Sequence, residues 1–227
     1  MFTEETIQFK TLVDQLYDYL NNSIIEGHLK SGEALIENDL CERFGISRSP
    51  IRECFRILES EGLITIVPRK GTFVRRFTGK EIEDIFPVRA YLEGLAAKLA
   101  TPHIGDKEIT ILDDLIKKMD NSISKKGVKP FLRYNYNFHS LFIKASKNDV
   151  LEKTLVRLGK GFWLRIAFLY YQYPSQLTLS NKMHKDILEA FKKGDARSAE
   201  RLVRKHIEHA KQPLIKSFGQ DVSLNNK

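Results

Sequence analysis

The stretch FGISRSPIREC, Phe44–Cys54, has the composition of a turn followed by the first turns of a helix. Gly45 can adopt the left-handed backbone conformation that closes a preceding helix. Either Ser47 or Ser49 can cap the next helix, and Pro50 is tolerated in a first turn, where the backbone nitrogen needs no helical partner. The stretch therefore predicts two helices joined by a tight turn.

The second of these helices has two faces of different character. Arg48 and Arg52 are four residues apart and therefore lie on one face. The other face is apolar and consists of Ile51, Phe55 and Leu58. A helix with an apolar back and with serine and arginine near its N-terminus suits insertion into the major groove of DNA.

The charge distribution indicates a local attraction to nucleic acid and not a global one. The chain of 227 residues has a formal net charge of +8, but residues 1–76 hold 10 basic and 12 acidic residues. Residues 77–227 hold 27 basic and 17 acidic residues. Within the first part, residues 43–76 hold 8 basic and 3 acidic residues, so DNA binding must depend on this local patch.

Composition excludes several classes of protein. Hydrophobic residues make up 42% of the chain, which is enough for a core. No apolar run approaches the roughly 20 residues of a membrane span, and the N-terminus is polar and acidic, unlike a signal peptide. Cys41 and Cys54 lack metal-type spacing, and we expect reduced thiols, with Cys54 as a small packed residue. The sequence therefore predicts a cytoplasmic protein.

The residues around the opening stretch complete a winged helix-turn-helix. Hydrophobic spacing predicts helices over residues 8–26, 35–44 and 47–61 and strands over residues 63–67 and 72–75. The turn between the two strands carries Arg69 and Lys70, which can reach a DNA phosphate.

From Thr78 onward, every periodic segment is helical. Thr78 and Glu81 form a capping box, so a new helix begins directly after the wing. The predicted helices span residues 79–100, 106–125, 128–147, 149–172, 175–193 and 195–217. The predicted fold class is mainly α: a winged helix-turn-helix over residues 1–76, an all-α bundle of six or seven helices over residues 77–218, and a flexible polar tail over residues 219–227.

Residues 10–76 resemble the DNA-binding domain of the GntR family of bacterial transcription regulators. The resemblance rests on GISRSPIRE (45–53), EGLI (61–64) and GTFV (71–74), together with Gly27, Gly32, Leu35, Glu37, Leu40 and Leu58. It implies that the operator is contacted by Ser47, Arg48, Ser49 and Arg52, with Gly71 in the wing.

Two positions depart from the pattern of that family. Ile36 stands where many members carry a capping serine or asparagine, so we expect a weaker start for the second helix. Asn38 stands where some members have a basic residue that contacts DNA, so one contact is expected to be missing.

Four residues of the second half could converge on a metal ion. Asn135 and His139 are four residues apart and share a helix face. His184 lies in the next-to-last predicted helix and His206 in the last. Three imidazoles and one oxygen ligand can bind a divalent metal inside a bundle, although spacing alone leaves open that these are hydrogen-bonded core histidines.

Residues 80–217 resemble the all-helical effector domain of the FadR-type branch of the family, the FCD domain. The matching segments are NYNFHSLF (135–142), HKDILEAF (184–191) with Gly194–Ala196, and RKHI (204–207). The resemblance implies that Asn135 and the three histidines bind a metal, commonly zinc or nickel, which helps to hold a small carboxylate effector.

The candidate metal site also departs from the family pattern, because Asn135 stands where aspartate is commoner. A neutral ligand leaves one more positive charge at the site, which should lower metal affinity and strengthen the attraction of an anionic effector. Arg89 and Arg165 are candidates to pair with the effector carboxylate. Both could equally form surface or interhelical ion pairs.

The sequence therefore predicts a ligand-responsive transcription regulator, expected to be a repressor. It would bind a short palindromic operator in double-stranded DNA as a homodimer and respond to a small anionic metabolite. One alternative is a regulator whose effector is the metal itself. Another is a metal-dependent enzyme with an appended DNA-binding domain, which is disfavoured because no Glu or Asp at a motif spacing marks a general base beside the histidines.

Overall fold

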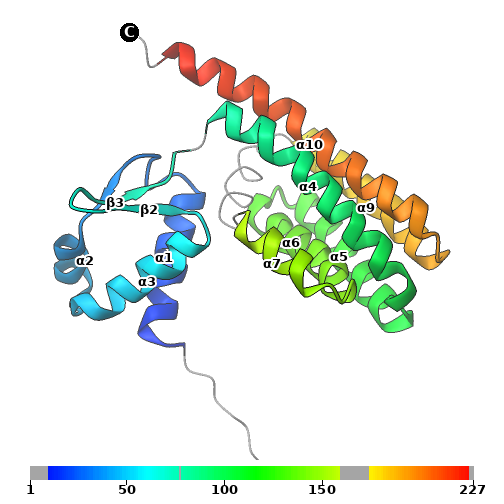
Figure 1. Cartoon of the computed structure of the whole chain (residues 1–227), viewed down its shortest axis with the longest axis horizontal. Helices are drawn as coiled ribbons and strands as arrows, with labels where there is room; N and C mark the ends of the chain where they lie inside the picture. The colour runs from blue at the N-terminus through cyan, green and yellow to red at the C-terminus, as the bar shows by residue number, and fades with distance from the viewer. Residues whose placement is uncertain (1–9, 77, 159–173, 225–227) are drawn as a thin grey trace, which may run out of the picture. The chain divides into compact units, whose positions relative to one another are not determined.

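The structure, a computed structural model, describes residues 10–76, 78–158 and 174–224 (Figure 1). The chain divides into two units, Met1–Arg76 and Phe77–Lys227. Each unit has its own cluster of buried hydrophobic side chains. The first unit combines helices with a small sheet, and the second is helical, so the predicted mainly α fold class is confirmed.

The first unit is a winged helix-turn-helix. Its elements are α1 (Leu12–Ile25), β1 (Ala34–Leu35), α2 (Glu37–Phe44), α3 (Arg48–Ser60), β2 (Ile64–Val67) and β3 (Gly71–Val74). Strands β2 and β3 form an antiparallel hairpin in which Ile64 lies opposite Val74. Strand β1 pairs antiparallel with the other side of β3, which gives the sheet order β1-β3-β2.

The start of α2 differs from the sequence prediction. Residue 35 was predicted to be helical, but Leu35 is buried in β1 and lies opposite Thr72. Ile36 is the N-cap residue of α2, and its apolar side chain makes no capping hydrogen bond. The absence of a cap at this position follows from the amino acid itself, since isoleucine has no oxygen to accept from the first backbone N–H groups.

The apolar back of α3 forms the centre of the first core. Ile51, Phe55 and Leu58 are fully buried, and α3 packs against α1. Cys54 is also fully buried, and burial raises the pKa of its thiol to about 12. This cysteine therefore packs as a small apolar residue, and the opposite face of α3 is left exposed.

The second unit is a bundle of helices. Its elements within the described residues are α4 (Gly79–Ala100), the short 3-10 helix η1 (Thr101–His103), α5 (Asp106–Ser124), α6 (Val128–Ala145), α7 (Asp149–Arg157), α9 (Pro174–Lys192) and α10 (Ala196–Leu224). Figure 1 shows α4 and α10 side by side, while α5 contacts both α6 and α9. The capping box of Thr78 and Glu81 is present at the start of α4.

The last helix is longer than the sequence suggested. It was predicted to end near residue 217 and to be followed by a flexible tail from residue 219, but α10 continues to Leu224. The helix was predicted to end too early because a single glycine costs a helix only about 1 kcal/mol, which need not end a helix that is already propagating. The flexibility of the tail stays a prediction.

Helices α4 and α10 approach each other closely. A Cβ atom added to Gly94 would lie 2.5 Å from Cγ of Arg204 and 3.1 Å from the backbone oxygen of Glu200. The two helices can therefore come this close only because residue 94 has no side chain. Among the helices that the structure describes, none has the length and hydrophobicity of a membrane span.

Candidate functional site

The N-terminus of α3 is presented by the turn that precedes it. Gly45 has a φ of +64° and its amide donates to the carbonyl of Cys41, which closes α2. The N-cap residue of α3 is Ser47, whose hydroxyl makes no capping hydrogen bond in the described structure. Ser47, Arg48 and Ser49 are all exposed. The first turn of α3 therefore offers two hydroxyl groups and a guanidinium to solvent.

Arg52 lies one turn further along α3 and has a partner in α2. Its Nε lies 3.1 Å from Oε1 and 3.0 Å from Oε2 of Glu37. Both side chains remain accessible, so this ion pair contributes little to stability. Its effect is geometric, because Glu37 restricts the directions in which the Arg52 guanidinium can point.

The wing ends in a tight turn with an unusual backbone conformation. The Lys70 amide donates to the carbonyl of Val67 at 3.0 Å, and Arg69 has a φ of +63°. Arginine in this left-handed region is strained, whereas Gly71, with a φ of +121°, is not. Arg69, Lys70 and Gly71 are exposed, as are the four candidate residues of α3.

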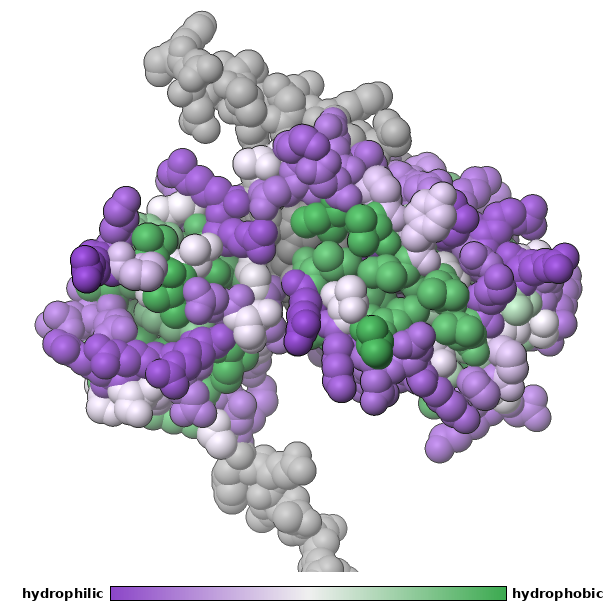
Figure 2. Space-filling model, in the orientation of Figure 1, coloured by the Kyte–Doolittle hydropathy of each residue, from purple (hydrophilic) through white to green (hydrophobic). Residues whose placement is uncertain are grey.

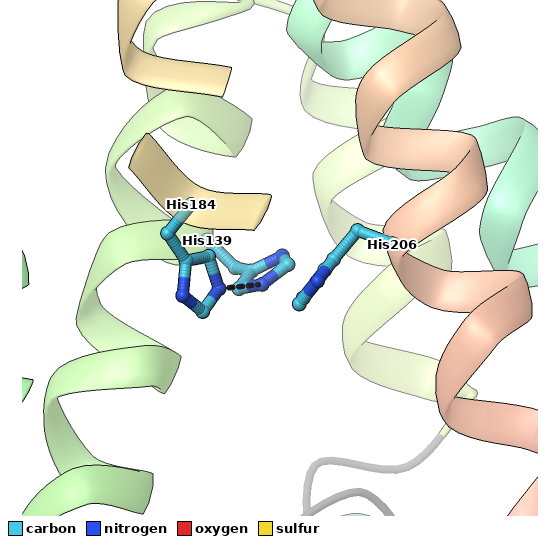
Figure 3. A group of neighbouring side chains, drawn as sticks. All are labelled: His139, His184 and His206. Carbon is cyan, nitrogen blue, oxygen red and sulfur yellow. Dashed lines mark hydrogen bonds between the residues drawn. The ribbon is translucent and has the colours of Figure 1, made fainter. Parts of the chain in front are cut away.

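Three histidines from three helices converge in the core of the second unit (Figure 3). His139 comes from α6, His184 from α9 and His206 from α10, and their side chains are 4%, 0% and 5% exposed. One ring nitrogen of each lies within 4.8 Å of the others. Nε2 of His139 is 3.4 Å from Nε2 of His184, and the His206 ring stacks on His139. The structure thus brings together three of the four predicted metal ligands.

A buried carboxylate supports this histidine cluster. Oε2 of Glu93, in α4, lies 2.6 Å from Nδ1 of His139. The other carboxylate oxygen of Glu93 accepts a hydrogen bond from Nε of Arg89, one turn earlier in the same helix. Glu93 is not at a motif spacing from any of the three histidines, and it was not among the residues predicted for this site.

Helix periodicity could have placed Glu93 on the buried face of α4, although not beside His139. The buried positions of α4 include Phe86, Ala90, Ala97 and Ala100, and residue 93 falls on the same face. A glutamate on an otherwise apolar face is rarely fully buried unless it is paired. The position was missed because its partner His139 is 46 residues away in the sequence.

The charges of the cluster follow from its burial. Burial alone would raise the pKa of Glu93, but the Arg89 guanidinium and His139 more than offset it and lower the pKa to about 2. An ionised carboxylate cannot donate, so Nδ1–H of His139 must donate to Glu93. In the neutral ring, Nε2 of His139 then has a lone pair directed at His184. Burial, followed by the neighbouring histidines, lowers the pKa values of His184 and His206 well below 6.5.

The cluster has the properties of a metal-binding site. Two nitrogens at about 2.05 Å from a tetrahedral metal are separated by about 3.3 Å, close to the 3.4 Å between the Nε2 atoms of His139 and His184. Nδ1 of His206 and Oδ1 of Asn135 are buried without a hydrogen-bond partner among the described residues. A buried polar atom without a partner costs about 1–3 kcal/mol, which a bound ligand would offset.

Of the two arginines predicted to bind the effector, the structure describes only Arg89. Arg89 is mostly buried and is bonded to Glu93, so it already has a partner inside the protein. Arg165 lies outside the described residues.

Comparison with known proteins supports the same division of the chain. Residues 12–74 match the bacterial regulatory proteins of the gntR family, and residues 84–209 match the FCD domain. The HTH-type transcriptional regulator YdhC of Bacillus subtilis (strain 168) is 32% identical over 197 residues, which are 86% of this chain and 87% of YdhC.

Two further proteins are similar over different lengths. The gluconate operon transcriptional repressor of Bacillus licheniformis is 35% identical over 132 residues, 58% of this chain and 54% of that protein. The solved structure of E. coli McbR/YncC has a TM-score of 0.76 at 21% identity and covers 92% of this chain and 100% of that chain. This second likeness concerns the fold alone.

The matched families are transcription regulators and not enzymes, which agrees with the sequence prediction. The FCD match spans more than half of the chain, and the similarity to YdhC extends over most of its length. The chain therefore belongs to the GntR family of bacterial DNA-binding transcription regulators, in the branch that carries an FCD domain.

Proposed function

We propose that this regulator is a repressor that binds a short palindromic operator as a homodimer and is controlled by a small carboxylate metabolite. The relative from Bacillus licheniformis is named a repressor of a gluconate operon, and gluconate is a small carboxylate. Two recognition helices related by a two-fold axis match an operator with the same symmetry, which is the reason to expect a homodimer.

Exposure and charge support the role of the first unit. Arg48 and Arg52 are on the exposed face of α3, and each guanidinium can form two hydrogen bonds to a guanine edge. Ser47 and Ser49, at the start of the same helix, suit contacts to phosphates or bases. In the wing, Arg69 and Lys70 would contact phosphates, with Gly71 allowing close approach of the backbone.

The observation that carries the regulatory part of the proposal is the buried histidine cluster. His139, His184 and His206 would hold a divalent metal, zinc or nickel, with the amide oxygen of Asn135 as a further donor. A metal at this position supplies a positively charged, open coordination position. All four donors are neutral, so they do not cancel the charge of the metal, and a small anion is the ligand that such a site favours.

Glu93 and Arg89 would act on this site indirectly. The Glu93 carboxylate fixes the tautomer of His139 that leaves Nε2 able to bind a metal. Arg89 keeps Glu93 ionised in a buried environment. We therefore assign Arg89 to the support of the metal site in place of direct contact with the effector.

Control of DNA binding requires a difference in affinity. The effector must bind the DNA-competent and DNA-incompetent states of the dimer unequally, and the coupling free energy equals that difference. A carboxylate bound at the histidine cluster would contact side chains from α6, α9 and α10, so its binding can favour one arrangement of these helices.

The proposal is tested by measuring operator binding at each stage of loading. An operator is first selected from random double-stranded DNA, and its affinity is then measured for metal-free protein, for protein with Zn²⁺ or Ni²⁺, and for metal-loaded protein with gluconate and other small carboxylates. We expect a change in affinity only when metal and a carboxylate are both present. Loss of operator binding with metal alone would instead support a metal-responsive regulator.

Matched variants locate the metal. His184→Ala should remove metal binding, whereas His103→Ala, an exposed histidine outside the cluster, should not. Asn135→Asp should bind metal more tightly than the parent, because a carboxylate replaces a neutral donor. Equal metal binding by the parent and His184→Ala would overturn the metal part of the proposal and leave the DNA-binding part intact.

A further inference from the structure

An acidic side chain lies on the surface of the first unit that we assign to DNA binding. Glu37 is the first residue of α2, and its carboxylate oxygens lie 3.0 and 3.1 Å from Nε of Arg52 on α3. Figure 2 shows hydrophilic side chains over the part of the first unit where α2 and α3 lie. A carboxylate beside a DNA-binding arginine repels phosphates, which weakens the general attraction to DNA.

Stability does not explain why this carboxylate is present. The side chain of Arg52 is 58% exposed and that of Glu37 is 30% exposed, and ion pairs between accessible groups add little to stability. Helices α2 and α3 share a core of buried apolar side chains that includes Leu40, Ile51 and Phe55. The ion pair is therefore not required to keep the two helices in contact.

The ion pair uses one donor of Arg52 and leaves the others free. A guanidinium has five N–H groups, and the one on Nε is the group that Glu37 accepts. The four N–H groups on the two terminal nitrogens have no partner among the described residues. Two parallel hydrogen bonds from these nitrogens can reach O6 and N7 of a guanine, which is the commonest specific contact in the major groove. The pair with Glu37 thus leaves the base-reading end of Arg52 available.

The carboxylate also changes which group on the DNA Arg52 prefers. A free guanidinium is attracted most strongly to a charged phosphate, which carries no sequence information. With Glu37 beside it, the pair has no net charge, and the carboxylate repels a phosphate that approaches Arg52. The edge of a guanine is uncharged, so its hydrogen bonds with Arg52 are not opposed in this way. Glu37 therefore disfavours the non-specific contact more than the specific one.

We propose that Glu37 is a positioning residue that determines operator specificity through Arg52. It holds the guanidinium in one direction before DNA arrives, which lowers the entropy that is lost on binding. It also directs the guanidinium to a guanine edge in preference to a phosphate. The inference rests on the DNA contact that the proposed function gives to Arg52 and adds a second residue that acts through it.

The first experiment measures the affinity of the full-length protein for the selected operator and for a scrambled duplex; the ratio of the two is the specificity ratio. Glu37→Gln should bind the operator about threefold to tenfold more weakly, because Arg52 is no longer held in place. It should bind the scrambled duplex roughly twofold more tightly, because a negative charge has been removed. The matched control, Glu42→Gln, removes an exposed charge from the same helix and should leave the specificity ratio unchanged.

The second experiment asks whether Glu37 acts through Arg52. In an Arg52→Ala background, Glu37→Gln should no longer lower the specificity ratio, because the side chain that Glu37 positions is absent. Selection of operators from random DNA gives a second readout, since Glu37→Gln and Arg52→Ala should relax the base preference at the same position of each half-site. An equal loss of the specificity ratio with and without the Arg52 side chain would overturn the inference.

The outcomes separate this inference from the proposed function. If Arg52→Ala lowers the specificity ratio and Glu37→Gln does not, Arg52 reads the operator without Glu37, and the inference alone fails. If Arg52→Ala leaves the ratio unchanged, the DNA contact assigned to Arg52 fails as well. If Glu37→Gln lowers both affinities together and also lowers stability in urea unfolding, Glu37 has a structural role and the inference is overturned.

Discussion

The candidate functional side chains of the two units differ in their surroundings. In the first unit, Arg48 and Arg52 lie on an exposed face of a helix whose back is held by a fully buried apolar core. In the second unit, His139, His184 and His206 lie within the core itself. Substitutions at the candidate functional residues should therefore affect function without stability in the first unit, and both together in the second. A buried polar group that loses its hydrogen-bond partner cannot bond to water instead, whereas an exposed one can.

The largest effect on stability is expected from a substitution of Glu93. If stability did not change, function and stability would not be coupled in the second unit. Glu93→Gln removes the carboxylate that pairs with the mostly buried guanidinium of Arg89 and replaces the ionised acceptor of His139 with a neutral amide. We expect a loss of about 3–5 kcal/mol in the free energy of unfolding and about 10–100-fold in metal affinity. Urea titration and metal titration measure the two effects.

Two variants serve as controls for Glu93→Gln. Glu208→Gln changes an exposed glutamate of α10 and should leave stability within about 0.5 kcal/mol of the parent. The double variant Arg89→Gln with Glu93→Gln removes both charges and should regain part of the lost stability. If the double variant is as unstable as the single one, the uncompensated charge is not the cause.

The next largest effect is a loss of operator affinity without a loss of stability. Arg48→Ala or Arg52→Ala should weaken operator binding by about 1–3 kcal/mol, because each removes a guanidinium from the exposed face of α3. The free energy of unfolding should change by less than about 0.5 kcal/mol. Lys107→Ala removes one exposed positive charge from the other unit and should have no such effect on binding.

A smaller effect is expected at the start of α2, where stability can be raised without a change in function. Ile36→Ser supplies the missing N-cap oxygen and should stabilise the first unit by about 1 kcal/mol. Ile36→Ala lacks that oxygen and controls for the loss of the exposed apolar side chain. Thermal unfolding measures both, and equal stability of the two variants would contradict the capping explanation.

The smallest effect on stability is expected in the wing. Here one substitution should change both stability and DNA binding, unlike the substitutions in α3. Arg69→Gly removes the strain of a left-handed arginine and should raise stability by about 0.5–1 kcal/mol. The same change removes a phosphate contact, so operator affinity should fall for all sequences and the salt slope should decrease by about 1. An unchanged salt slope would show that Arg69 does not reach the DNA.

Most of the fold could be predicted because its signals are local. The left-handed Gly45 closes α2 and begins the turn before α3, and the capping box of Thr78 and Glu81 marks the first residue of α4. Strand β1 could not be predicted, because two residues show no periodicity and this strand exists only through hydrogen bonds to β3. The predicted end of α10 was too early because Gly219 was taken as a helix end, although a single glycine need not end a helix.

The candidate metal site could be predicted only in its ligands. His139, His184 and His206 were identified from spacing together with a family resemblance, and the structure brings them together. Glu93 was not identified, because its role depends on how α4 packs against α6. Local sequence indicates which residues can bind a metal, whereas the residues that orient them are determined by tertiary packing.

Gly94 affects the position of His206 in the histidine cluster. It lies next to Glu93 in the sequence, and its lack of a side chain determines how close α10 can come to α4. His206 is only two residues beyond Arg204, the residue that a side chain at position 94 would displace. A single methyl group added to α4 at position 94 would thus shift His206 on the neighbouring helix, so the geometry of the histidine cluster depends partly on the absence of a side chain at residue 94.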